Sequence, residues 1–111
     1  AIPAGHIVGA AQLLVEQAGE RLVYTGDLKL MPPMCGAATE VVRCDRLIIE
    51  STFGLPIFHF LTREEARTRI AAFATATLED GGVPVFLGYP LGRGQEIVEV
   101  LANAGIPCAV H

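Results

Sequence analysis

The chain has 111 residues, of which 51% are hydrophobic and 18% charged, so it can bury one modest core or parts of two. Its net charge of −4 excludes a generic basic nucleic-acid-binding module, but not an enzyme whose bound divalent metals add positive charge where phosphates sit. No apolar run approaches the roughly 18 residues of a membrane span, and the N-terminal residues lack the pattern of a signal peptide.

The first half of the chain has the pattern of strands joined by loops. Residues 11–16 predict a strand, residues 21–25 its hairpin partner, and Gly19-Glu20 the turn between them. Residues 26–39 are irregular and rich in turn-forming residues. Residues 45–49 predict a third strand, and its apolar run indicates burial on both faces.

The second half changes to a helical period. Thr62 and Glu65 fit a capping box at the start of a helix. In chain order, the pattern then predicts that helix up to Gly81-Gly82, a strand at 83–87, a helix at 92–104 and a strand at 106–110. Alternating strands and helices imply parallel β-α-β geometry with right-handed crossovers. The chain therefore divides near residues 51–60.

Each predicted helix carries a set of residues at helical spacing, so that they share one face. In the first helix these positions are Ala66, Ile70, Phe73, Ala74 and Thr77. In the second helix they are Ile97, Val98 and Leu101, and Gly105 provides the C-terminal stop.

The cysteines give no sign of a disulfide framework, because Cys35, Cys44 and Cys108 are too few and too irregularly spaced. We interpret them as reduced thiols of a cytoplasmic protein. A metal site at Cys35 and Cys44 would need a C-x-x-C pair or a nearby histidine, and neither is present.

Two candidate functional side chains follow glycines beside strand-like runs. His6 follows Gly5, which leaves room for an imidazole to point into a pocket; the alternative is an ordinary surface or capped histidine. Asp27 ends the run Tyr24-Thr25-Gly26-Asp27, where a carboxylate would project from a strand end. Its alternative role is that of a turn aspartate closing an Asx-turn.

Glu50 is a third candidate, because it follows the apolar run 47–49. Burying an unpaired carboxylate costs roughly several kcal/mol, so Glu50 should have a partner. That partner is an arginine, a set of backbone donors or a metal-bound histidine. The alternative is a strand-end glutamate that caps the turn at residues 51–54.

Weaker candidates lie in the second half. Residues 88–95 join a strand to a helix, and their glycines with Arg93 suggest a phosphate cradle, although the Gly-Lys-Ser/Thr ending of a P-loop is missing. The alternative is a plain turn. His59 lies in a hydrophobic segment and has the context of a packed or surface histidine, and His111 is terminal.

Taken together and in order, these strings resemble the metallo-β-lactamase fold and, within it, the β-CASP nucleases. Residues 3–12 are similar to the third motif of that fold, residues 24–27 to the fourth, and residues 49–54 to motif A, which separates β-CASP proteins from other lactamase-fold hydrolases. Residues 50–57 are most similar to the bacterial ligase-associated DNA exonucleases. Ribonuclease J and the cleavage-factor endonucleases are close relatives of that branch.

This resemblance implies an α/β fold. Residues 1–54 would be the C-terminal part of a metallo-β-lactamase αββα sandwich half, and residues 55–111 would begin an α/β β-CASP cap. His6 would ligate one of two zinc ions, and Asp27 would bridge both. Glu50 would orient the metal site and assist proton movement. Motifs absent from this chain would supply the other ligands, so we expect a piece of a larger enzyme that is inactive alone.

The implied activity is zinc-dependent hydrolysis of phosphodiester bonds in DNA or RNA, with a DNA exonuclease ahead of an RNA-processing nuclease. The expected partners are a nucleic-acid substrate and a DNA ligase or helicase, in the cytoplasm and away from membranes. Two other classes stay open. One is a lactamase-fold hydrolase of small esters, against which the α/β cap argues; the other is a non-catalytic module that binds nucleic acid or protein.

Overall fold

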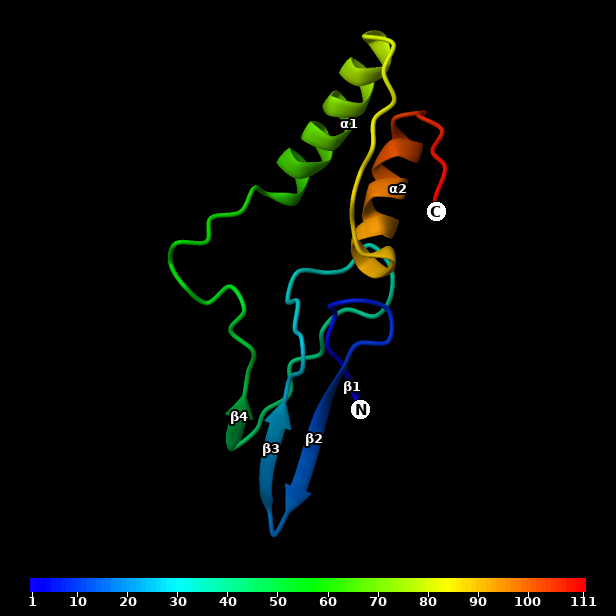
Figure 1. The fold of residues 1–111 in the computed structure, drawn as a ribbon. Coiled ribbons are helices and arrows are strands. Elements are labelled where there is room, and N and C mark those ends of the chain that lie inside the picture. The colour runs from blue at the N-terminus through cyan, green and yellow to red at the C-terminus, as the bar shows by residue number, and fades with distance from the viewer. The chain divides into compact units, whose positions relative to one another are not determined.

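A computed structural model describes residues 1–111. The chain forms two compact units, Ala1–Pro56 and Ile57–His111, which differ in content: the strands lie in the first and the helices in the second (Figure 1). Neither helix has the length and apolar character needed to cross a bilayer. The fold is mixed α/β, as predicted, and the assignment of the units to a lactamase core and a β-CASP cap stays a prediction.

The first unit is built on a four-stranded sheet in the order β1-β2-β3-β4. Its strands are β1 (Ile2–Pro3), β2 (Ala11–Gln17), β3 (Glu20–Tyr24) and β4 (Arg46–Ile48). The first three strands pair antiparallel, whereas β4 pairs parallel to β3 (Figure 1). Because β3 and β4 run parallel, the segments that follow them leave the sheet at the same end.

The β2–β3 hairpin confirms the sequence prediction, with its turn one residue earlier than expected. The turn residues are Ala18 and Gly19, with φ of 52° and 84°. Two positive φ values in a two-residue hairpin loop are the mark of a type I′ turn, whose twist matches that of the strands. Across the hairpin, the Arg21 guanidinium forms an ion pair with Glu16 at 2.9 Å.

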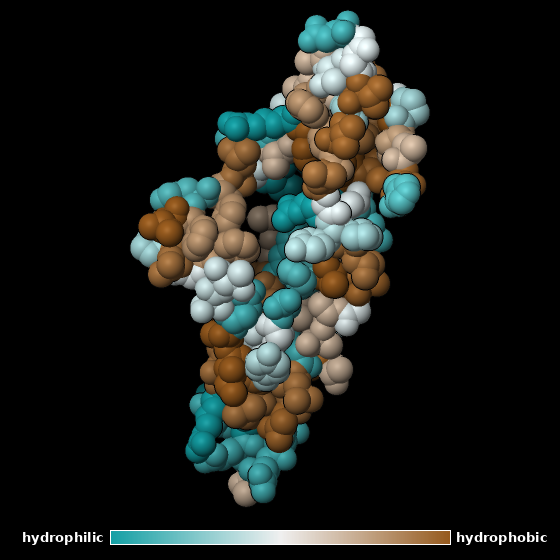
Figure 2. Space-filling model, viewed as in Figure 1, coloured by the Kyte–Doolittle hydropathy of each residue, from teal (hydrophilic) through white to brown (hydrophobic).

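The prediction that the third strand is buried on both faces is wrong for this chain. Leu47, Ile48 and Ile49 are 54%, 51% and 53% exposed. The reason is that β4 is the last strand in the sheet order and the first unit contains no helix to cover it. Hydrophobic surface accordingly shows over the sheet in the lower part of Figure 2.

The second unit contains α1 (Arg63–Glu79), the irregular turn η1 (Pro90–Gly94) and α2 (Gln95–Asn103). The predicted capping box is confirmed: the Thr62 hydroxyl accepts from the Glu65 amide at 3.2 Å, and the Glu65 carboxylate accepts from the Thr62 amide at 2.8 Å. Gly81 ends α1 with φ of 75°, and the Gly82 amide donates to the Thr77 carbonyl at 2.8 Å. This arrangement is a Schellman motif.

The strands predicted at 83–87 and 106–110 do not form, so the second unit has no parallel β-α-β geometry. An extended segment becomes a strand only when a partner pairs with its backbone, and neither segment has such a partner here. Residues 83–87 keep the alternation of a strand: Phe86 is half-buried and meets the ring of Phe73 edge-on at 5.5 Å, whereas Leu87 is 93% exposed.

The apolar face of the second helix is rotated relative to the prediction. Leu101 is buried as expected, but Val100 is buried in place of Val98, which is 36% exposed. The helix also begins at Gln95 rather than at Gly92, whose φ of 78° is incompatible with a helix. The two helices contact each other, and the Arg67 guanidinium of α1 pairs with Glu99 of α2, the residue before Val100, at 3.3 Å.

Candidate metal centre

His6 lies in a short loop that follows β1. The Ala4 amide closes the loop by donating to the Ala10 carbonyl at 3.1 Å. Gly5 is buried with φ of +68°, and a Cβ there would lie 2.6 Å from the Lys29 carbonyl oxygen. Only glycine fits this conformation and this space. The loop therefore packs tightly at Gly5 while the next residue, His6, is exposed.

Asp27 lies beyond the end of β3, where the chain turns through Gly26 with φ of +56°. Thr25 anchors this turn and is 2% exposed. Its amide donates to the Ile48 carbonyl at 3.0 Å, and its hydroxyl donates to the Gly26 carbonyl at 2.7 Å. Asp27 itself is exposed, so its carboxylate is available to a ligand.

The structure brings His6 and Asp27 together. Both line one open depression of about 340 Å³, which residues 7–11 also line. They reach it from different loops, one after β1 and the other after β3. This shared depression is the geometric feature on which the candidate site rests.

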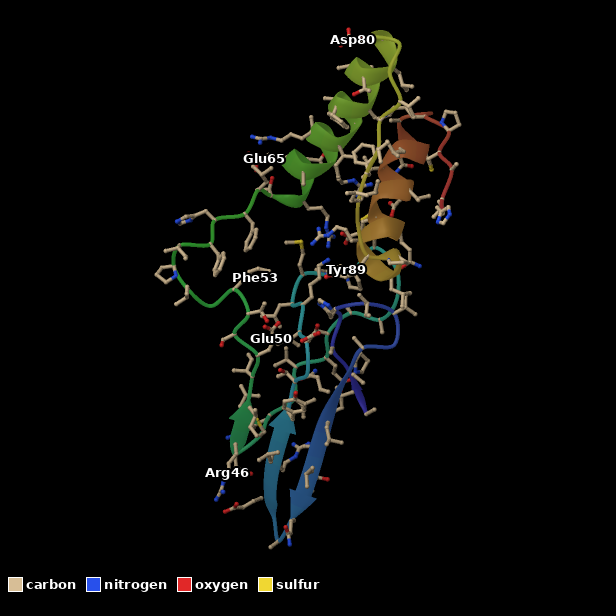
Figure 3. All side chains as sticks on the ribbon, viewed as in Figure 1. Arg46, Glu50, Phe53, Glu65, Asp80 and Tyr89 are labelled. Carbon is tan, nitrogen blue, oxygen red and sulfur yellow. The ribbon has the colours of Figure 1, made fainter.

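Glu50 lies just beyond the end of β4 and is half-buried (Figure 3). One carboxylate oxygen accepts from the Thr52 amide at 2.9 Å and the other from the Leu28 amide at 3.3 Å. Of the three partners that the sequence allowed, backbone donors are the ones found. The bond to Thr52 fits the capping role, and the bond to Leu28 reaches the residue after Asp27.

These contacts lower the pKa of Glu50 below its ordinary value of 4.5. The amide and hydroxyl of Thr52 contribute most, followed by the Leu28 amide, and together they outweigh partial desolvation. The nearby charge of His6 lowers the pKa further. A carboxylate that accepts several hydrogen bonds is held in its charged form.

The weaker candidates stay apart from this site. In residues 88–95 the Gly92 amide donates to the Gln95 side chain at 3.0 Å, and Arg93 lies 3.8 Å from Glu96. The amides of Gly92 and Gly94 are thus already bonded within the segment, which favours the plain turn. His59 is exposed in the second unit. None of the three cysteines forms a disulfide.

The donor set fits part of a zinc site. Histidine nitrogen and carboxylate oxygen are both zinc ligands, and His6 and Asp27 share one depression. A catalytic zinc usually takes three protein ligands. No group of three or more histidine, cysteine, aspartate or glutamate side chains in the chain is arranged to hold a metal. The further ligands of a zinc site would therefore come from outside residues 1–111.

Sequence reasoning missed the residues that support this site. Gln12 and Thr25 are the buried polar side chains, and Gln12 donates to the carbonyls of Pro3 at 2.9 Å and Glu40 at 2.8 Å. A glutamine at an inward position of an apolar strand was the available sign, because buried polar groups need partners. Thr39, which bonds Ala4 and Lys29, lies in an irregular segment that gives no such sign.

Comparison with known proteins shows which protein family the chain is related to. A probable DNA ligase of Opitutus terrae is 40% identical to it over 98% of this chain and 11% of the ligase. An RNase J-like protein of Methanocaldococcus jannaschii is 33% identical over 90% of this chain and 24% of that protein. A protein in the lig 3′ region of Acidianus ambivalens is 34% identical over 95% of this chain and 71% of that protein. The chain belongs to the β-CASP metallo-β-lactamase family.

This β-CASP chain spans about a tenth of the length of the probable DNA ligase and about a quarter of the length of the RNase J-like protein. No protein-family model matches it. The assignment of metal motifs to His6, Asp27 and Glu50 stays a prediction. The branch within the family and the roles of the three residues stay predictions.

Proposed function

We propose that this chain is part of a zinc-dependent nuclease that hydrolyses phosphodiester bonds in DNA or RNA. The observation that carries the proposal is the meeting of His6 and Asp27 in one depression, with Glu50 bonded to the residue after Asp27. The RNase J-like relative supports a nuclease as the activity. The chain alone is expected to be inactive, because it holds too few metal ligands.

Each residue has a distinct task in this proposal. His6 would hold a metal ion through the imidazole that its exposed loop presents, and Asp27 would hold the two-ion centre through its exposed carboxylate. Glu50 fixes the backbone that carries Asp27 by accepting from the Leu28 amide. Two bound zinc ions would supply a hydroxide near neutral pH and stabilise charge on the phosphate.

Within this proposal we prefer DNA as the substrate and an exonuclease as the activity. Two relatives are named for a ligase, one as a probable DNA ligase and one by its place in the lig 3′ region. The RNase J-like relative favours RNA processing as the second candidate. We also propose association with a DNA ligase or helicase, which the ligase names support. We propose a cytoplasmic location as well, with which three cysteines that form no disulfide agree.

The test is a cleavage assay on the full-length gene product with end-labelled single-stranded DNA, duplex DNA and RNA of one sequence. Cleavage should stop on chelation and return with zinc, and shortening from one end of DNA would support the exonuclease. Asp27→Ala should abolish cleavage while leaving the melting temperature near that of the wild type, because Asp27 is exposed. A fully active Asp27→Ala variant would remove the proposed bridge, and binding without cleavage would favour a non-catalytic module.

A further inference from the structure

Two backbone segments converge on the side chain of Thr39. Its hydroxyl lies 2.8 Å from the carbonyl oxygen of Ala4 and 2.5 Å from that of Lys29. A hydroxyl has one proton to donate, so the two carbonyl oxygens share it. The Lys29 amide also donates to the Ala4 carbonyl at 3.0 Å, which joins the two segments directly.

Each anchored carbonyl lies close in sequence to a proposed metal ligand. Ala4 precedes His6 by two residues, and Lys29 follows Asp27 by two residues. Successive Cα atoms are only about 3.8 Å apart, so a shift at either anchor moves the neighbouring ligand. The Thr39 hydroxyl therefore joins the two loops that line the depression.

The packing around Thr39 is close on the side of His6. A Cβ at Gly5 would meet the Thr39 hydroxyl and would lie 2.9 Å from the Thr39 amide nitrogen. The backbone beside Thr39 is held independently, because the Glu40 amide donates to the Pro3 carbonyl at 3.1 Å. Removing the hydroxyl therefore removes one of the two links between the loops. The direct bond from the Lys29 amide to the Ala4 carbonyl remains, and the segment that carries Thr39 stays held.

We propose that Thr39 is a positioning residue that sets the spacing between His6 and Asp27 for a shared metal. The inference rests on the proposed function. Its chemistry is indirect, because the hydroxyl bonds the backbone that carries the ligands and not the ligands themselves. It goes beyond that function by assigning the geometry of the site to a residue outside the metal motifs.

The test compares Thr39→Val, which keeps the volume and loses the hydroxyl, with Thr39→Ser, which keeps the hydroxyl. Thr77→Val is the matched control, since the Thr77 hydroxyl also donates to a carbonyl, that of Phe73 at 2.8 Å, in the other unit. Zinc affinity of the full-length gene product is measured by competition with a chelator. The visible spectrum of the Co²⁺-loaded protein reports the ligand geometry.

Thr39→Val should bind zinc about tenfold more weakly and shift the Co²⁺ spectrum, because changes to groups that orient ligands have effects of this size. Thr39→Ser should restore both readouts, and Thr77→Val should change neither. If Thr39→Val does not fold, Thr39→Ala takes its place, since alanine also lacks the hydroxyl and adds no new metal ligand.

Wild-type zinc affinity and spectrum in Thr39→Val would overturn the positioning role and leave the proposed nuclease intact. A wild-type protein that binds no zinc would overturn both. Loss of affinity in Thr77→Val equal to that in Thr39→Val would show a general effect of stability and would likewise overturn the inference.

Discussion

At the scale of single residues, Glu50 shows how one carboxylate serves two segments of backbone. Its two oxygens accept from the amides of Leu28 and Thr52, so each holds a hydrogen bond before any metal or substrate is considered. These bonds tie the turn after β4 to the residue that follows Asp27. Glu50 therefore has a structural role at the site, and the part in proton movement that we propose would come in addition to it.

Glu50→Gln should destabilise the protein by about 1–2 kcal/mol, because an amide offers one acceptor oxygen where two amides require two. Urea unfolding of the variant and the wild type measures this difference. If Glu50 also assists the reaction, turnover of the full-length gene product should fall more than its zinc content. Equal turnover in both proteins would leave Glu50 a purely structural role.

The lowered pKa of Glu50 makes this contribution depend on pH. Because the pKa is lower in the folded protein than its ordinary 4.5, the stabilisation is present above that value and is lost as the pH falls through the folded pKa. The stability gap between the wild type and Glu50→Gln should therefore be constant near neutral pH and close in acid. Urea midpoints measured from neutral pH into acid would show this, and a constant gap would contradict it.

At the scale of elements, local chemistry decided which predictions succeeded. The Thr62–Glu65 capping box, the glycine stop at Gly81 and the β2–β3 hairpin each depend on a few neighbouring residues, and all three are present. Residues 83–87 and 106–110 needed partner strands, and β4 needed a covering layer. Such partners are a property of the surrounding fold, which the pattern of a single segment does not contain.

The hairpin turn offers a stability test at this scale. Ala18 has φ of 52°, a region that costs an ordinary L-residue roughly 1–2 kcal/mol but suits asparagine. Ala18→Asn should therefore raise the free energy of unfolding by about 1 kcal/mol, since Asn-Gly is the preferred type I′ pair. The opposite change, Ala18→Val, should lower it, because β-branched residues are disfavoured at positive φ. Thermal unfolding of the wild type and of both variants measures these two changes in the free energy of unfolding.

At the scale of the whole molecule, the candidate site draws on loops after three different strands. Sequence motifs singled out His6, Asp27 and Glu50 individually as candidates. They did not locate Gln12, Thr25 or Thr39, whose importance arises from contacts across long stretches of chain. The metal-binding roles themselves stay predictions.

Zinc content is the prediction that belongs to this scale. The full-length gene product should contain close to two zinc ions, as the family resemblance implies, and the 111-residue chain should retain less, because it holds no complete ligand group. Elemental analysis of both proteins after dialysis gives the two numbers. Absence of zinc from both would remove His6 and Asp27 from the list of ligands.

The parallel pairing of β3 with β4 has a consequence for the order of folding. The hairpin closes between neighbours in sequence, whereas the bonds from Thr39 to Ala4 and from Glu50 to Thr25 span 35 and 25 residues. Closing long loops is slower because more chain entropy is lost before any contact forms. We therefore expect the hairpin to form early and the loops bearing His6 and Asp27 to settle late, so that metal capture follows the sheet rather than nucleating it.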